Sequence, residues 1–186
     1  NDSISGGTIA SWKQSLSGQM VFELTGASVP VTQLATWAAT GNDEAAKTAF
    51  LAGHDSITGS QVADRMHGYG GDDTVVGAGG DDFLRGEAGD DSISGGAGFD
   101  DTHGNMGRDT ISGGAGADWV VGGQDSDLLS GDEGDDIVYG NMGADTQHGG
   151  DGVDWVRGGQ ANDSLSGGAG DDWMWGDRGD DTLSGG

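Results

Sequence analysis

The chain has 186 residues, of which 41 are Gly and none is Cys, and its formal net charge is −25. This length suits one domain or two small ones. The lack of Cys excludes a disulfide framework, a thiolate metal site and a Cys nucleophile. The charge argues against a nucleic-acid partner, which needs clustered Lys and Arg. No apolar run approaches the ~18 residues of a membrane-spanning helix, so we expect no membrane span.

The first 53 residues carry no regular pattern and are predicted to form a small cap of mixed, partly helical structure. Met20–Leu24 is typical of a short strand. A helix is expected over Val31–Ala39 because Pro30 can begin it, and a second from Asn42 or Asp43 to about Ala52. We expect this segment to cover the open apolar end of the second unit, residues 54–186.

A nine-residue repeat begins at residue 55 and continues to the end of the chain. An Asp occupies every ninth position, and a Gly follows each of them four residues later: Asp55, Asp64, Asp73, Asp82, Asp91, Asp100, Asp109, Asp118, Asp127, Asp136, Asp145, Asp154, Asp163, Asp172 and Asp181. The residue two after each Asp is apolar except at Thr102 and Gln147. The unit therefore reads G-x-x-G-x-D-x-U-x, where U is a large apolar residue.

The fullest copies, residues 95–100 and 113–118, resemble the RTX (repeat-in-toxin, hemolysin-type) calcium-binding nonapeptide repeat, and the resemblance covers residues 55–186. It implies an all-β fold: a parallel β-roll, a right-handed β-solenoid with 18 residues per coil. Each six-residue turn would bind Ca²⁺, and each x-U-x would be a short strand.

The residue types suit this chemistry. Calcium prefers six to eight oxygen ligands from carboxylates and backbone carbonyls. Glycine permits backbone conformations that let carbonyls converge on an ion, and Asp supplies negative charge. A strand of three residues buries only one side chain, so the apolar interior is thin. We therefore expect the chain to fold only when it binds calcium.

The family implies that each ion lies between equivalent turns of adjacent coils and takes carbonyls from both turns as well as the Asp carboxylate. The candidate carboxylates are Asp64, Asp73, Asp82, Asp91, Asp100, Asp109, Asp118, Asp127, Asp136, Asp145, Asp154, Asp163, Asp172 and Asp181. The candidate turn glycines are Gly77, Gly80, Gly86, Gly89, Gly95, Gly98, Gly104, Gly107, Gly113, Gly116, Gly131, Gly134, Gly140, Gly143, Gly149, Gly152, Gly167 and Gly170.

Each edge of the roll would carry seven of these Asp and six gaps between them, which predicts up to about 12 Ca²⁺ against the net charge of −25. Three turns depart from the pattern at the second Gly. Val62 replaces it in 59–64, Asp125 in 122–127 and Ala161 in 158–163. These sites are expected to be weak or vacant, or Asp125 adds a carboxylate.

Alternate nonapeptides are expected to build opposite sheets, so the outward residues divide into two unlike faces. One face is mostly Ser and Thr, from Ser56 to Ser184. It is typical of a solvated β-face with cross-strand hydroxyl pairs. An ice-binding surface is the alternative, which the mixture of Ser with Thr disfavours.

The other face is rich in aromatic residues and Arg. Its candidate partner-binding residues are Trp119, Tyr139, Trp155, Arg157, Trp173 and Trp175. An exposed face of this kind indicates a contact surface. It could pack against another domain or a second roll, contact a protein receptor, or bind a polysaccharide whose rings stack on the aromatic side chains and whose carboxylates pair with Arg.

We predict no enzyme activity, because His54, His67, His103 and His148 form no H-E-x-x-H motif and no nucleophile elbow is present. The family implies a bacterial protein exported by type I secretion to the exterior or the cell surface. Both chain ends fall within repeats, which predicts a piece of a longer protein. We expect a structural, secretion-linked calcium module; the alternative is an adhesion module that binds a surface or polysaccharide.

Overall fold

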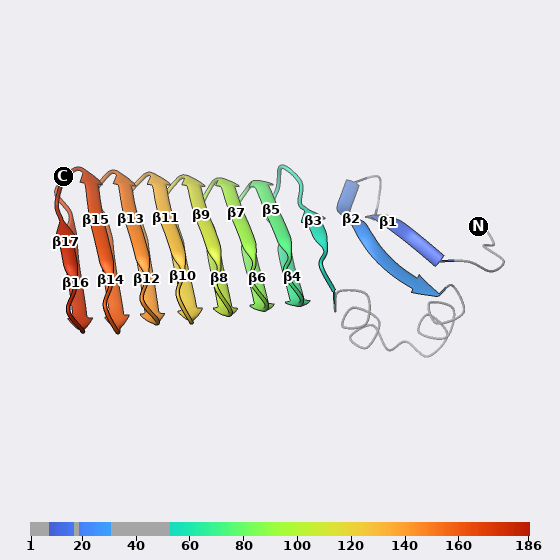
Figure 1. Ribbon diagram of the computed structural model, residues 1–186. Helices are drawn as coiled ribbons and strands as arrows, with labels where there is room; N and C mark the ends of the chain where they lie inside the picture. The colour runs from blue at the N-terminus through green and yellow to red at the C-terminus, as the bar shows by residue number, and fades with distance from the viewer. Residues whose placement is uncertain (1–7, 17–18, 31–52) are drawn as a thin grey trace.

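The computed structural model describes residues 8–16, 19–30 and 53–186, and for the first two ranges it describes the backbone alone. The described chain consists of strands joined by turns (Figure 1). The strands are β1 (Thr8–Leu16), β2 (Gln19–Pro30), β3 (Ser56–Thr58), β4 (Arg65–Gly70), β5 (Thr74–Gly79), β6 (Phe83–Ala88), β7 (Ser92–Ala97), β8 (Asp101–Met106), β9 (Thr110–Ala115), β10 (Trp119–Gln124), β11 (Leu128–Glu133), β12 (Ile137–Met142), β13 (Thr146–Asp151), β14 (Trp155–Gln160), β15 (Ser164–Ala169), β16 (Trp173–Arg178) and β17 (Thr182–Ser184).

Two sheets face each other in a parallel β-roll. From β3 onward the odd-numbered strands join one sheet, which has 10 strands including β1 and β2, and the even-numbered strands form a sheet of seven. Neighbouring strands are parallel and paired with an offset of 18 residues, as in Ile93 opposite Ile111. The chain therefore changes sheet with every nonapeptide, as the sequence predicts (Figure 1).

The apolar U residues point into the space between the sheets and form the core. The buried members are Ile57, Met66, Val75, Leu84, Ile93, Ile111, Val120, Leu129, Val138, Val156 and Leu165. The U positions of successive coils lie one above another and so form a column in each sheet. Thr102 and Gln147 occupy U positions in these columns and are also fully buried. Each coil of 18 residues thus contributes only two inward side chains, a thin core to offset ~1–2 kcal/mol of backbone entropy per ordered residue.

The expected strand length is wrong. Apart from β3 and β17, the strands of the roll have six residues and not three. The pairing does not stop after x-U-x but includes residues of the turn, such as Gly96 opposite Gly114 and Ala97 opposite Ala115. The reason is that stacked coils have nearly identical backbones, so their amide and carbonyl groups also meet along the first half of each turn.

Strands β1 and β2 form an antiparallel pair, and β2 continues the larger sheet by pairing antiparallel with β3. The predicted strand Met20–Leu24 lies within the longer β2. Strand β1 was not predicted, and Pro30 is the last residue of β2. The two predicted helices lie outside the described residues.

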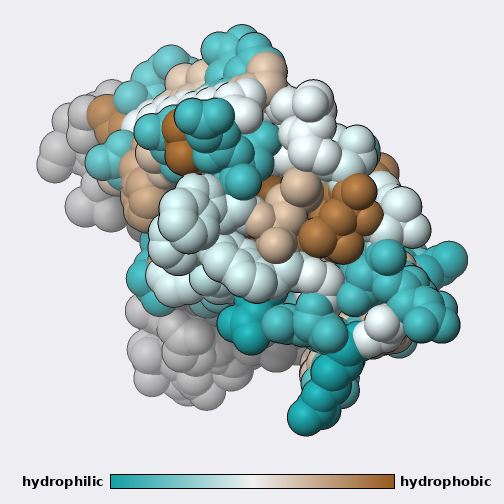
Figure 2. Space-filling view, turned by 90° about the vertical axis from the view of Figure 1, so that its left-hand side faces the viewer, coloured by the Kyte–Doolittle hydropathy of each residue, from teal (hydrophilic) through white to brown (hydrophobic). Residues whose placement is uncertain are grey.

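The last coil exposes apolar groups that inner coils cover. Leu183 of β17 is 45% exposed, whereas Leu165 one coil inward is 2% exposed. Figure 2 looks onto this end of the roll and shows hydrophobic residues among hydrophilic ones. Stacking of one coil on the next is thus what buries each inward side chain. Among the described residues no helix has the length and apolar character to cross a membrane.

Candidate metal sites in the turns

From the turn 68–73 onward, the backbone of each turn places two residues in the left-handed region, whereas the turn 59–64 places none there. In the turn that ends at Asp100, Gly96 has φ 116° and Gly98 has φ 131°. The second of these positions is Gly in nearly every copy, as expected for a conformation that Cβ disfavours. The first is often not Gly: Tyr69 and Glu87 take φ 73° and 81° there. The coil below therefore enforces the turn even on residues that avoid this conformation.

One oxygen of each repeat Asp fixes the spacing of the coils. The backbone N–H of Asp100 donates to Oδ1 of Asp118 at 2.8 Å, and Asp118 N–H donates to Oδ1 of Asp136 at 2.7 Å. The same bond joins every such pair from Asp55 to Asp181, at 2.7–3.1 Å. These Asp are thus structural acceptors as well as candidate ligands.

The second oxygen of these carboxylates is buried without a donor. Among the described residues, Oδ2 has no hydrogen-bond partner in Asp55, Asp73, Asp82, Asp91, Asp100, Asp109, Asp118, Asp127, Asp136, Asp145, Asp154, Asp163 and Asp172. A buried charged oxygen without a partner is costly. Bound cations at successive turns would balance such a row of buried oxygens.

Backbone carbonyls converge on the same places. A methyl group placed on Gly95 would overlap both Oδ2 of Asp100 and the carbonyl oxygen of Gly113 in the next coil. At Gly77, Gly131 and Gly149 an added methyl group would meet the equivalent two oxygens: the Asp Oδ2 of its own turn and a Gly carbonyl oxygen of the next coil. Glycine thus leaves room where a carboxylate of one coil and a carbonyl of the next approach each other. Hard oxygens in this arrangement suit calcium, so the residues present fit the ion.

Burial makes these carboxyl groups weak acids when no cation balances them. Burial, with a smaller contribution from the charges of the neighbouring Asp109 and Asp145, raises the pKa of Asp127 to about 8. It raises the pKa of Asp73, Asp109 and Asp136 to about 7. A bound divalent cation would favour the charged form and reverse this effect.

The imperfect turns behave differently from one another. In the turn 59–64, Oδ2 of Asp64 accepts hydrogen bonds from Ser60 N–H at 2.6 Å and Ser60 Oγ at 2.9 Å. Asp64, a predicted ligand, is therefore already paired. By contrast, Asp125 and Ala161 hold φ 69° and 82°, so their turns keep the left-handed backbone of the repeat.

Sequence reasoning left Asp55 out of the ligand set, although its Oδ2 is as buried and unpaired as the others. The position of Asp55 as the first Asp of the nine-residue series is the feature of the sequence that would have placed it among the candidate ligands. No group of three or more His, Asp or Glu side chains among the described residues could hold a metal ion. Any cation site in these turns must therefore draw mainly on backbone carbonyls.

The aromatic face lies on the seven-stranded sheet, and it brings the predicted partner residues close together at the C-terminal half. Trp155 and Trp173 stack with ring centroids 5.8 Å apart and an interplanar angle of 18°. Trp175 lies 5.8 Å from Trp155 and 6.2 Å from Trp173. Trp119 on β10 lies two strands away from Trp155 on β14, and the centroid of its ring is 6.2 Å from that of His103.

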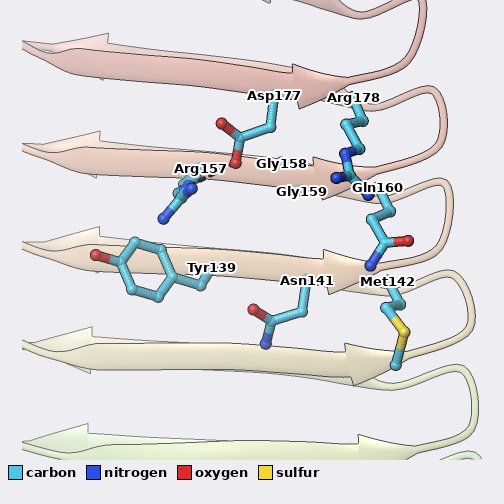
Figure 3. A pocket seen from close by; sticks show the side chains of 9 residues that line it. All are labelled: Tyr139, Asn141, Met142, Arg157, Gly158, Gly159, Gln160, Asp177 and Arg178. Carbon is cyan, nitrogen blue, oxygen red and sulfur yellow. Dashed lines mark hydrogen bonds and ion pairs between the residues drawn. The ribbon is translucent and has the colours of Figure 1, made fainter.

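A hollow of about 730 Å³ lies on the same sheet (Figure 3), and one of its lining residues, Arg157, is the strand neighbour of Trp175. It is lined by Tyr139, Asn141, Met142, Arg157, Gly158, Gly159, Gln160, Asp177 and Arg178. Gly159 is flanked by Asn141 and Asp177 on neighbouring strands. Because Gly159 has no side chain, the space between those two side chains stays open and forms the bottom of the hollow. Arg157 Nε pairs with Asp177 Oδ2 at 2.5 Å. Among the described residues Arg178 forms no ion pair.

Two facing sheets of parallel strands are joined by stacked glycine-rich turns, each of which ends in an Asp that is buried in most copies. These features define the class of this protein: a β-roll of nonapeptide repeats. The sequence model of the RTX calcium-binding nonapeptide repeat, which spans four copies, matches residues 51–84, 67–102, 76–111, 103–138, 112–147 and 148–183. The chain belongs to this family of calcium-binding repeats. No curated protein sequence matches the chain.

Proposed function

We propose that the chain is a calcium-dependent folding module whose ions lie between equivalent turns of adjacent coils. The observation that supports this most directly is the row of buried Asp Oδ2 atoms without a donor, which repeats with the 18-residue period of the coils. A cation beside each would balance the charge, and the turn carbonyls would supply further oxygen ligands. When bound, calcium contributes its binding free energy to folding.

In this proposal each residue of the turn has a defined task. Asp Oδ2 offers a charged ligand, while Oδ1 keeps the preceding coil in register. Gly at the first turn position keeps the space free of Cβ. The candidate ligands are those predicted from the sequence, with Asp64 as the weakest because Ser60 already pairs with it.

The number of bound ions tests this proposal. Native mass spectrometry of the chain with calcium should show many ions, up to about 12 by the count of gaps between repeat Asp, at concentrations where Mg²⁺ adds few. Mg²⁺ is the control because it demands a tighter octahedral site and loses water reluctantly. A chain that binds no calcium, or binds both ions equally, would contradict the proposal.

We further propose that the module acts outside a bacterial cell, as part of a secreted or surface protein exported by type I secretion. Proteins with RTX repeats are typically secreted. Folding that waits for calcium keeps the chain extended until it meets a calcium-rich medium, and extracellular calcium modules work at about 10⁻⁴–10⁻³ M. Calcium titration of folding checks this: a midpoint far below the micromolar range would contradict it.

A second function, polysaccharide binding, is favoured by the Trp155–Trp173 stack. Trp173 is 55% exposed and Trp175 41% exposed, so their rings are open to a ligand. Aromatic faces suit sugar rings, and the unpaired Arg178 beside the hollow suits a carboxylate. Four of the chain's five Arg lie on this sheet although the molecule is strongly acidic. The proposed contact residues are Trp119, Tyr139, Trp155, Arg157, Trp173 and Trp175.

Retention of the calcium-loaded chain on an immobilised uronate polymer tests this second function. The double variant Trp155→Ala/Trp173→Ala should lose retention, whereas Leu128→Ala, an exposed apolar residue of the opposite sheet, should keep it. A neutral glucan in place of the uronate reports the part played by Arg178. Equal retention of both variants, or no retention of the parent chain, would overturn the proposed polysaccharide binding. If the Trp155→Ala/Trp173→Ala variant changed only in oligomer size, the aromatic face would instead be a protein interface.

A further inference from the structure

Gln147 is a polar residue in a column that is otherwise almost entirely apolar. It lies on β13, two residues after Asp145, and its side chain is 0% exposed. Its Nε2 donates to the backbone carbonyl of Arg157 at 3.0 Å, across the interior on β14. Its Oε1 is buried and has no donor among the described residues. An unsatisfied buried amide oxygen is unfavourable, so the pattern break needs a compensating partner.

The amide of Gln147 reaches one of the candidate cation positions. A methyl group placed on Gly140 would meet Oδ2 of Asp145, the amide nitrogen Nε2 of Gln147, and the carbonyl oxygen of Gly158 at 2.7 Å. The first and third of these are the carboxylate and carbonyl found at the other turns. Only here, among the described turn glycines, does a polar side chain from the core join them.

The length of the side chain explains the reach. At Gly59 the methyl carbon of Met66, the U residue of that repeat, would lie 3.2 Å from the added carbon. Long unbranched U residues can therefore extend to the inner side of a turn, where branched Val and Ile do not. Met66 brings a carbon there, whereas Gln147 brings an amide.

Oxygen and nitrogen of an amide have the same shape, and which one faces a given neighbour depends on the hydrogen-bond partners present. Without a cation, Nε2 faces the carbonyl of Arg157. Beside a cation, rotation of the amide by half a turn would present Oε1 instead. Calcium accepts Gln side-chain carbonyls as ligands.

We propose that Gln147 supplies its side-chain oxygen to a calcium ion held between the turns 140–145 and 158–163. The second of these turns has Ala161 where the repeat has Gly. The extra ligand would therefore support a site that the sequence pattern alone indicates to be weak. The proposal rests on the calcium-binding function proposed above and names a ligand that the nonapeptide pattern does not contain.

Substitution of Gln147 tests the proposal with the calcium-saturated full chain. Gln147→Leu restores the apolar column, and Gln147→Met keeps the side-chain length and removes the oxygen. Both substitutions should weaken the affinity for one calcium ion by roughly tenfold, as loss of one ligand interaction implies. Both should also lower the midpoint of thermal unfolding at saturating calcium. Gln147→Glu, which keeps an oxygen at this point, should retain the ion.

The sign of the thermal shift separates this role from a structural one. If Gln147 is only a buried polar residue, Leu and Met remove an unpaired oxygen and should raise the unfolding midpoint with the ion count unchanged. That result would overturn the inference and leave the calcium function intact. A parent chain that binds no calcium in mass spectrometry would instead refute the function on which the inference rests.

Discussion

From Asp73 to Asp172, each repeat Asp uses its two carboxylate oxygens differently. Oδ1 accepts the N–H of the Asp in the preceding coil, and Oδ2 faces the space beside a turn glycine. A substitution that spares the first contact and changes the second therefore separates register from cation binding. Asp118 is suited to such a test because it lies in the middle of the roll.

We predict that Asp118→Asn and Asp118→Ala differ. Asn keeps an acceptor for Asp100 N–H but loses the charge, so it should weaken calcium binding at its turn while the calcium-saturated roll keeps its register. Ala removes both and should cost roughly 1–3 kcal/mol more than Asn, because it leaves the buried N–H of Asp100 without an acceptor. Calcium titration with urea unfolding at saturating calcium measures both effects. Identical behaviour of the two variants would contradict the separate tasks.

The raised pKa values of the repeat carboxyls predict opposite pH responses with and without calcium. The pKa of Asp127 is about 8 and that of Asp136 about 7 in the roll, against about 3.9 in an unfolded chain. Protonation therefore favours the folded form. This stabilisation is complete below about pH 4 and is lost progressively as the pH rises from there through the folded pKa values of about 7 and 8.

The chain in chelator should thus show more strand at about pH 5 than at about pH 8. At saturating calcium the order should reverse, because the cation requires the ionised carboxylates and releases protons when it binds. Circular dichroism at both pH values, with and without calcium, measures this. The same pH response in both conditions would count against cations at these carboxylates.

At the scale of the element, the turn depends on two left-handed residues, and the chain contains its own test of that requirement. Gly116 has φ 140°, and a methyl group there would overlap the carbonyl of Gly98. Ala161 occupies the equivalent position of another turn with φ 82°. A non-glycine residue in this region is strained by about 1–2 kcal/mol.

We predict that Gly116→Ala destabilises the calcium-bound roll by at least that amount, ~1–2 kcal/mol. Ala161→Gly should stabilise it by a smaller amount, because glycine also gains freedom in the unfolded chain. Thermal unfolding at saturating calcium provides the comparison. Shifts of the same sign in both variants would show that backbone strain does not limit these turns.

Much of the element-level structure was predictable because the repeat is strict. The nine-residue Asp series and the apolar U positions carry the resemblance to the RTX repeat, and that resemblance implied the two parallel sheets and the 18-residue coil. Glycine at the second left-handed position was equally predictable. The left-handed Tyr69 and Glu87 were not, since their own preferences oppose that conformation and only the neighbouring coil enforces it.

The candidate site was predictable as a set of residues and less so as an arrangement. The sequence indicated which Asp and Gly belong to the turns. It could not indicate that Oδ1 bonds one coil away, because that contact depends on the register of stacked coils. It also marked Gln147 only as an exception, whose reach to Gly140 appears when two sheets are placed face to face.

At the scale of the whole molecule, negative charge and a thin core act together. The net charge of −25 opposes compaction, and two inward side chains per coil give limited apolar burial. The buried Oδ2 atoms add to the cost unless they are balanced. Ions between the coils would remove the repulsion and the unpaired charge at the same time, so folding and calcium binding should be one cooperative event.

Circular dichroism of the chain after exhaustive chelation at low salt, followed by addition of calcium, tests this most directly. We predict little strand in chelator near neutral pH, cooperative recovery of the strand signal with millimolar calcium, and no recovery with Mg²⁺ at the same concentration. A chain that keeps its full strand signal in chelator would contradict the central claim that cations hold the coils together.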